Sequence, residues 1–293
     1  MKKILFLAFG LGLINLSAAQ NKPLEHTLLW EITGMDLKQP SYLFGTMHIL
    51  CAEDARLGDS LRTFIKNVDE IYFEINLDDI GGMLKSLQFM RMNDNKKLSD
   101  LLPEKDYLKV KNYFEKDGAS ILPFSMLERF KPLLISSLIQ EDDLDCKTTN
   151  GMELVIMKEA HAQGKKIDGL ETAEFQAGLF DSIPYDKQAK DLVNYIDSMG
   201  EYKKMTKDLA EVYRQQDLEK IDELTKGSDV TISNYLDLLL YGRNRRWVEK
   251  LRTLMPEKSL LIAVGAGHLA GEQGLISLLR QKGYTVLPVK NEN

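Results

Sequence analysis

The chain has 293 residues, of which 44% are hydrophobic and 28% charged, and its formal net charge is −6. This composition excludes an intrinsically disordered chain, and two cysteines are too few for a disulfide-rich miniprotein or a cysteine-rich zinc module. Interspersed charges with an acidic balance argue against nucleic acid as a partner.

The N-terminus has the pattern of a secretory signal peptide. Lys2 and Lys3 precede an apolar run, and the small residues Ser17, Ala18 and Ala19 follow it. The pattern predicts a signal peptide over residues 1–19, cleaved after Ala19. The apolar run is shorter than the roughly 20 residues that a membrane-spanning helix needs. We therefore expect an exported protein, periplasmic or secreted, with no membrane span after cleavage.

The remaining elements follow in chain order from hydrophobic periodicity and turn residues. Two β-prone runs, 28–32 and 41–45, are joined by a segment rich in turn-forming residues and predict a hairpin. The further predicted elements are a helix over 56–68, a strand over 69–75, helices over 82–92, 104–114, 126–139 and 152–163, a strand over 166–170, helices through most of 186–255, a strand over 259–264, a helix over 272–281 and a strand over 284–289. We expect breaks in the long helical region near Gly200, Gly227 and Gly242.

The predicted strands lie near both ends of the chain, and the middle is helical. This order predicts an α+β fold with an α/β-like core, in which N- and C-terminal strands share a central mixed β-sheet surrounded by helices. No linker-like segment interrupts the sequence, so we expect residues 20–293 to form one domain. The pattern does not determine the order of the strands.

Export would place Cys51 and Cys146 in an oxidising compartment, where an even number of cysteines favours a disulfide. The alternative is a nucleophilic or metal-binding thiol.

Two of the four histidines occur in the same local pattern. The segment 45–48, Gly-Thr-Met-His, follows one predicted strand, and the segment 265–268, Gly-Ala-Gly-His, follows another. Glycine at a strand exit permits a tight turn or a close backbone approach, and ligands of α/β proteins commonly bind at the carboxyl edge of the sheet. The repeat therefore indicates a site that contains His48 and His268. We expect the other two histidines, His26 and His161, at the surface.

Two carboxylates repeat this placement. Glu74 lies inside an apolar strand, and Glu171 lies at the end of another. Two imidazoles with one or two carboxylates can hold a divalent metal ion that activates water for hydrolysis. The alternatives are histidines that only form hydrogen bonds at strand ends, a Glu74 paired with an arginine such as Arg243, and a Glu171 that interacts with a helix dipole.

These motifs resemble the TraB/PrgY/GumN family, also called TIKI-like. The resemblance rests on the segments 44–48 and 264–274, on Glu74, on the segment 169–172 with Gln176, and on the pair Arg243-Asn244. It spans about residues 28–289, which is nearly all of the expected mature chain.

The resemblance implies an α/β core with two related halves, each carrying one Gly-x-x-His motif. Animal members of the family are metal-dependent proteases that trim a secreted signalling protein. By similarity, His48, His268 and Glu74 match metal-ligand positions, and Glu74, Glu171, Arg243 and Asn244 match catalytic positions. Gly242 departs from the family pattern, because relatives commonly have an acid before Arg-Asn.

The expected function is an exported metal-dependent hydrolase, a peptidase that acts on a peptide or a secreted protein with Mn, Co or Zn as its metal. One alternative is a non-catalytic protein that binds and sequesters a peptide, haem or a metal ion. Another is a metal-independent, esterase-like hydrolase in which a histidine is the general base.

Overall fold

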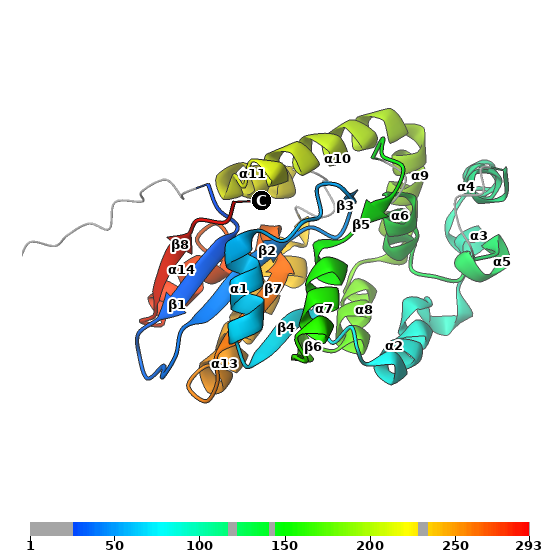
Figure 1. Ribbon diagram of the computed structural model, residues 1–293. Helices are drawn as coiled ribbons and strands as arrows, with labels where there is room; N and C mark the ends of the chain where they lie inside the picture. The colour runs from blue at the N-terminus through cyan, green and yellow to red at the C-terminus, as the bar shows by residue number, and fades with distance from the viewer. Residues whose placement is uncertain (1–25, 117–121, 141–143, 228–233, 293) are drawn as a thin grey trace, which may run out of the picture.

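A computed structural model of the chain describes residues 26–116, 122–140, 144–227 and 234–292 (Figure 1). The predicted signal peptide, residues 1–19, lies outside this part of the chain. None of the helices within it is long and apolar enough to cross a membrane.

A six-stranded mixed sheet forms the centre of the fold, with the strand order β6-β4-β7-β2-β1-β8. Its strands are β1 (Leu29–Thr33), β2 (Ser41–Thr46), β4 (Glu70–Ile75), β6 (Lys166–Glu171), β7 (Leu260–Gly265) and β8 (Thr285–Val289). Neighbours among β6, β4, β7 and β2 are parallel, and β1 is antiparallel to both β2 and β8. All six predicted strands and the β1–β2 hairpin are confirmed, as is the mixed sheet built from both ends of the chain.

Two very short strands outside the main sheet, β3 (Leu50–Cys51) and β5 (Thr149–Asn150), were not predicted, because two residues carry no readable alternation. They pair with each other, and the predicted disulfide between Cys51 and Cys146 lies beside them and is confirmed. The disulfide and the strand pair together fix the segment that follows His48.

Most of the other described residues are helical. They are α1 (Asp59–Asn67), α2 (Ile80–Ser86), α3 (Leu98–Leu101), α4 (Glu104–Lys116), α5 (Phe124–Leu127), α6 (Pro132–Gln140), α7 (Met152–Ala162), α8 (Ala173–Leu179), α9 (Tyr185–Asp197), α10 (Met199–Arg214), α11 (Leu218–Gly227), α13 (Gly242–Leu254) and α14 (Leu275–Gln281). Short 3₁₀ segments are η1 (Leu87–Met90), η2 (Asn93–Asn95), η3 (Phe180–Ser182) and η5 (Ala266–His268), and η4 (Asp237–Tyr241) is a π-helix.

Two helix predictions were wrong in detail. The predicted helix 126–139 is two helices, because Pro132 begins α6 rather than lying inside one continuous helix. The helix expected over 82–92 begins at Ile80 and ends its α-helical part at Ser86. The break expected near Gly200 is confirmed, since α9 ends at Asp197 and α10 begins at Met199, with the non-helical Ser198 between them.

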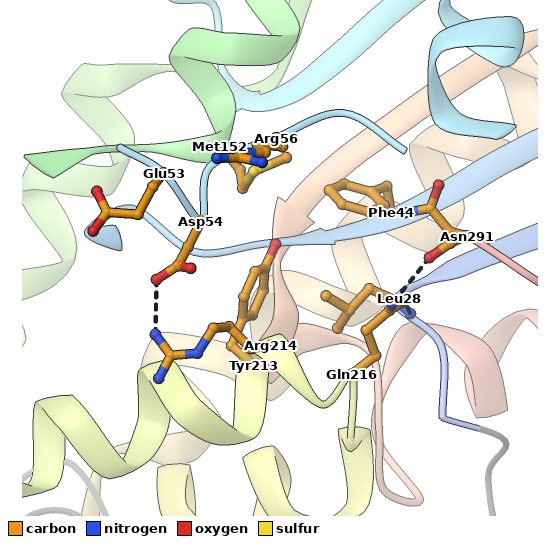
Figure 2. Close-up of a pocket in the computed structure, with 10 residues that line it drawn as sticks. All are labelled: Leu28, Phe44, Glu53, Asp54, Arg56, Met152, Tyr213, Arg214, Gln216 and Asn291. Atoms are coloured by element: carbon orange, nitrogen blue, oxygen red, sulfur yellow. Dashed lines mark hydrogen bonds and ion pairs between the residues drawn. The ribbon is translucent and has the colours of Figure 1, made fainter. Parts of the chain in front are cut away.

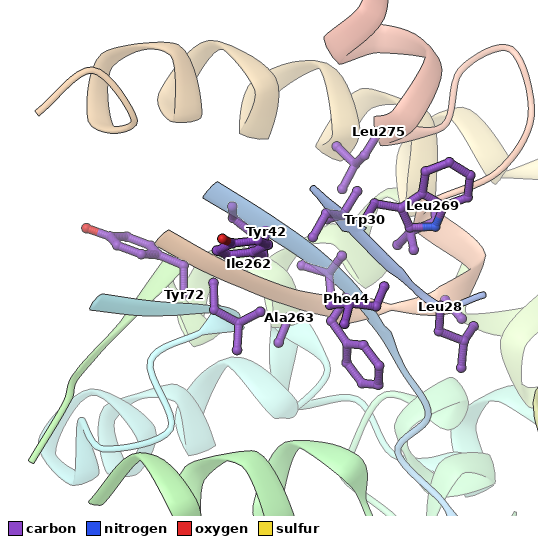
Figure 3. Packing of buried hydrophobic residues seen from close by; sticks show 14 of the residues in the cluster. Leu28, Trp30, Tyr42, Phe44, Tyr72, Ile262, Ala263, Leu269 and Leu275 are labelled. Carbon is purple, nitrogen blue, oxygen red and sulfur yellow. The ribbon is translucent and has the colours of Figure 1, made fainter. Parts of the chain in front are cut away.

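The sheet is covered by helices on both faces (Figure 1), with α1 and α7 on one side and α13 and α14 on the other. On the first face, the ring of Tyr42 stacks on Phe64 of α1 with centroids 3.7 Å apart. Figure 3 shows Trp30 and Leu275 of α14 together on the opposite face. Such burial on both faces fits strands that read as nearly continuous apolar runs.

A second apolar cluster lies in the helical middle of the chain. It is formed by α3, α4, α5, α6 and α9, and its buried residues include Val110, Phe130, Ile135 and Leu192. This helical part lies beside the end of the sheet that contains β6 and β4 (Figure 1).

The topology brings the sequence motifs to one place. Because β2, β4, β6 and β7 run parallel, their carboxyl ends meet at one edge of the sheet. Both Gly-x-x-His motifs and both strand-end carboxylates therefore lie along that edge.

Candidate functional site

Arg243 is the centre of the site. Its guanidinium makes five polar contacts, which equals its number of N–H donors. Nε donates to Glu171 Oε1 at 2.8 Å, and Nη2 lies 2.6 Å from the same oxygen. Nη2 also donates to Glu74, while Nη1 donates to the Leu239 carbonyl at 2.9 Å and lies 3.2 Å from Nε2 of His268. The side chain is only 8% exposed, so one buried cation holds two carboxylates and an imidazole.

Asn244, the next residue of α13, fixes the tautomer of His268. The Asn244 amide nitrogen donates to the carbonyls of His268, at 3.3 Å, and Gln273, at 2.8 Å. Its oxygen is therefore an acceptor, and Nδ1 of His268 donates to it at 2.6 Å. Nε2 is then the acceptor that faces Arg243. Burial lowers the pKa of His268 to about 3, so the ring is neutral.

Glu74 is ionised although it is buried. Gly265 N–H donates to Oε1 at 3.0 Å, and Gln176 donates to Oε2 at 3.0 Å. Burial by itself would raise the pKa of this carboxyl, but the Arg243 guanidinium and the Gly265 N–H outweigh it and hold the pKa well below its usual range. A carboxylate accepts about four hydrogen bonds, so three donors leave room for one more.

Gly265 is the glycine of the second motif, and its lack of a side chain favours this contact. A Cβ atom at this position would lie 3.2 Å from Oε1 of Glu74. The missing side chain lets the backbone N–H approach the carboxylate closely. This explains why a glycine ends β7 at the point where the site begins.

Glu171 is a partner of Arg243 and is turned away from open space. The indole N–H of Trp247 donates to its Oε2 at 3.0 Å, and its side chain is 6% exposed. The Trp247 ring also lies against Arg243, with the guanidinium carbon 4.6 Å from the ring centroid. Glu171 and Trp247 therefore help to position Arg243, whose Nη2 also contacts Glu74.

A π-helix places Arg243. The segment Asp237–Tyr241 is wound as a π-helix directly before α13, and it presents the Leu239 carbonyl to the guanidinium. Such π-helical turns are rare and are often found at functional sites. A Cβ atom on Gly242 would lie 2.7 Å from the Asp237 carbonyl oxygen, so the wider turn needs a glycine here. This is the physical reason for the residue that departs from the family pattern.

His48, the histidine of the first motif, has a different partner from the one expected. Its Nδ1 lies 2.8 Å from Oε1 of Glu153, and its side chain is 68% exposed. Glu153 lies in the first turn of α7, which the N–H of Met152 ties to the Met47 carbonyl at 3.1 Å. The Glu153 carboxylate raises the pKa of His48 to about 9, so this ring is an imidazolium at neutral pH.

A cavity of about 280 Å³ joins the two halves of the site. His48 and Glu153 line one part of it, Glu74 and Gln176 line another, and Leu154 adds an apolar side chain. Gln176 belongs to α8, whose first turn Thr172 caps by accepting a hydrogen bond from the Phe175 N–H at 3.1 Å. The cavity is the space in which a substrate could contact both His48 and Glu74.

The structure thus brings five predicted residues into one hydrogen-bonded cluster: Glu74, Glu171, Arg243, Asn244 and His268. His48 is paired with Glu153 instead and shares only the lining of the cavity with Glu74. Glu153 and Trp247 were missed by the sequence analysis, because an acid in a first helical turn and a tryptophan in a helix have ordinary structural explanations. As expected, His26 and His161 are exposed.

A second cavity, of about 260 Å³, lies near the ends of β1 and α10 (Figure 2). Its lining includes Tyr213, Arg214 and Asp54, and the last two are paired at 2.7 Å. It contains none of the residues expected in the site, so we assign the site to the cavity beside His48.

Comparison with known proteins identifies the family of this chain. The model of the TraB/PrgY/gumN family matches residues 28–288. The chain belongs to this family.

Three relatives illustrate the range of the family. The metalloprotease TIKI homolog of Amphimedon queenslandica is 26% identical over 91% of this chain, and metalloprotease TIKI2 of Danio rerio is 25% identical over 89%. The chain spans about three fifths of these two relatives, 62% and 60% of their lengths. The uncharacterized protein YbaP of Escherichia coli is 24% identical over 82% of this chain and 87% of its own length. No solved structure matches the chain.

The names of the TIKI relatives suggest a metal cofactor, and the donor set here has suitable chemistry, with imidazoles and carboxylates. The arrangement does not fit a metal ion. In the described residues, no group of three or more His, Cys, Asp or Glu side chains is placed to hold one. The guanidinium of Arg243 faces Nε2 of His268 and contacts Glu74, so a cation already occupies the position between these donors. His48 is directed to Glu153 instead.

Proposed function

We propose that the protein is an exported hydrolase that cleaves peptide bonds in the cavity beside His48. The observation that carries the proposal is the His48–Glu153 pair, which faces a cavity whose other wall holds the ionised Glu74. The TIKI relatives, named metalloproteases, support hydrolysis of peptides rather than of another class of substrate.

Each residue has a distinct part in the proposed reaction. Glu153 orients the His48 ring, and the imidazolium donates a proton to the leaving nitrogen of the amide. Glu74 has capacity for one further hydrogen bond, which it would accept from the water that attacks the carbonyl, and it would take that water's proton as the new C–O bond forms. After the C–N bond breaks, the proton passes from Glu74 through water to the neutral His48 ring, which restores both groups. Gln176, Gly265 and Arg243 hold that carboxylate in place.

The proposed hydrolysis does not depend on the expected metal, Mn, Co or Zn. A metal ion at Glu74 and His268 could bind only if Arg243 moved away from them. A metal-independent hydrolase that uses His48 is the second candidate. It is favoured by the Arg243 contacts, which fill the cation position.

The test is cleavage of a peptide library by the purified mature protein, with and without a chelator. Cleavage at defined bonds supports the proposal, and no cleavage under any metal condition contradicts it. Loss of cleavage in chelator that Mn²⁺, Co²⁺ or Zn²⁺ restores supports the metal-dependent form. Cleavage that the chelator leaves unchanged supports the second candidate.

A further inference from the structure

The guanidinium of Arg243 lies where the family resemblance implies a metal ion, in contact with His268 and Glu74. Nε2 of His268 is the only nitrogen of that ring free to bind a metal, since Asn244 holds Nδ1. That nitrogen faces the guanidinium at 3.2 Å. The two nearest carboxylates, Glu74 and Glu171, also contact the guanidinium.

The cluster also carries unbalanced charge. One guanidinium lies between two carboxylates, with Nε2 of His268 beside it. Buried charges are costly when they are unpaired, so removing the guanidinium would leave two adjacent carboxylates and an imidazole without the cation that contacts all three. Two carboxylates and one imidazole are a ligand set that divalent metals accept.

We propose that Arg243 is the resident cation of this cluster and competes with a divalent metal ion for Glu74, Glu171 and His268. A metal binds these three side chains tightly only when the guanidinium is displaced. The 3.2 Å contact between Arg243 and His268 leaves no room for an ion at Nε2 while Arg243 stays in place. The inference does not depend on peptidase activity, because metal binding and thermal stability are measured without substrate.

The test compares metal binding in the wild type, Arg243→Met and Arg243→Gln. All three proteins carry His161→Ala, so that the exposed pair of His161 and Asp78 adds no metal binding of its own. Each is stripped with a chelator, and its melting temperature and bound metal are measured against Mn²⁺, Co²⁺ and Zn²⁺. We expect either Arg243 variant to bind one equivalent about 100-fold or more tightly than the wild type, because a competing buried cation has been removed.

Three results would overturn the inference. The first is a folded Arg243 variant that binds metal no more tightly than the wild type. The second is tight binding in the variant that survives His268→Gln. The third can be measured even if neither Arg243 variant folds: micromolar metal raises the melting temperature of the wild type, and His268→Gln abolishes this rise. If the variants do not fold and metal leaves the melting temperature of the wild type unchanged, the inference is supported.

Discussion

The disulfide between Cys51 and Cys146 should be a large contributor to stability. It joins residues separated by 95 positions in the sequence. In the chain-entropy model, closing a loop of that size removes about 16 cal/mol/K of entropy from the unfolded chain, or about 4.7 kcal/mol at 25 °C. Measured contributions of disulfides are typically about 2–4 kcal/mol, so we expect reduction to cost about 3–5 kcal/mol.

The assay is urea unfolding of the mature protein with and without reductant, followed by the free energy extrapolated to water. The matched control is the double variant Cys51→Ala/Cys146→Ala, which should have the stability of the reduced wild type and should not respond to reductant. Each kcal/mol corresponds to about 2–4 °C in melting temperature for a domain of this size. A loss below about 1 kcal/mol on reduction, or a response of the control to reductant, would refute the reasoning.

Three further substitutions test the packing and charges of the site. Glu74→Ala leaves the buried Arg243 with one carboxylate partner instead of two and should cost about 3–5 kcal/mol in urea unfolding. Glu249→Ala removes two exposed ion pairs, with Arg252 and Lys282, and should have little effect. Similar small effects of both would contradict the buried pairing. Tyr213→Phe removes the hydrogen bond to the Gly45 carbonyl, 2.8 Å long, and should cost about 1–2 kcal/mol. Burial raises the pKa of Tyr213 in the folded protein above its unfolded value of about 10. The stability that the neutral hydroxyl contributes is therefore present below about pH 10 and is lost as the pH rises above it. The wild type should lose stability above about pH 10 more steeply than Tyr213→Phe, and parallel curves of stability against pH would contradict this. Gly242→Ala should destabilise by about 1–3 kcal/mol, because its Cβ would meet a carbonyl oxygen at 2.7 Å, although alanine is otherwise the better helix former. A stabilised Gly242→Ala variant would show that the π-helical turn is not constrained.

The strands of the main sheet were predictable because each is a short apolar run bounded by turn residues. Their order was not, since no local pattern says that β7 lies between β4 and β2. The two-residue strands β3 and β5 depend on the disulfide and on their long-range pairing, and no periodicity marks them.

The helical middle shows what single residues can indicate. The break expected near Gly200 is present at Ser198, between α9 and α10. Pro132 was placed inside one helix, although proline is most compatible with a helix start, where the structure has it.

Within the site, the strand-end positions of His48, Glu74, Glu171 and His268 followed from their motifs. Of their contacts, the pair of Glu74 with Arg243 was among the alternatives and is confirmed. The sequence could not show that Arg243 would also contact Glu171 and His268, because that depends on a π-helical turn before α13. Nor could it show that His48 would pair with Glu153, since long-range contacts bring the two together: the β3–β5 pair and the hydrogen bond from the Met152 N–H to the Met47 carbonyl.

The central claim is that the cavity beside His48 is where a peptide bond is cleaved. It is tested most directly by comparing His48→Ala with His161→Ala on one peptide that the wild type cleaves. Both variants remove an exposed histidine paired with a carboxylate, but only His48 lines the cavity. We predict that His48→Ala lowers kcat by about 100-fold or more, the usual effect of losing a proton-transfer group, with unchanged melting temperature, while His161→Ala keeps wild-type rates. Equal rates for wild type and His48→Ala would contradict the account.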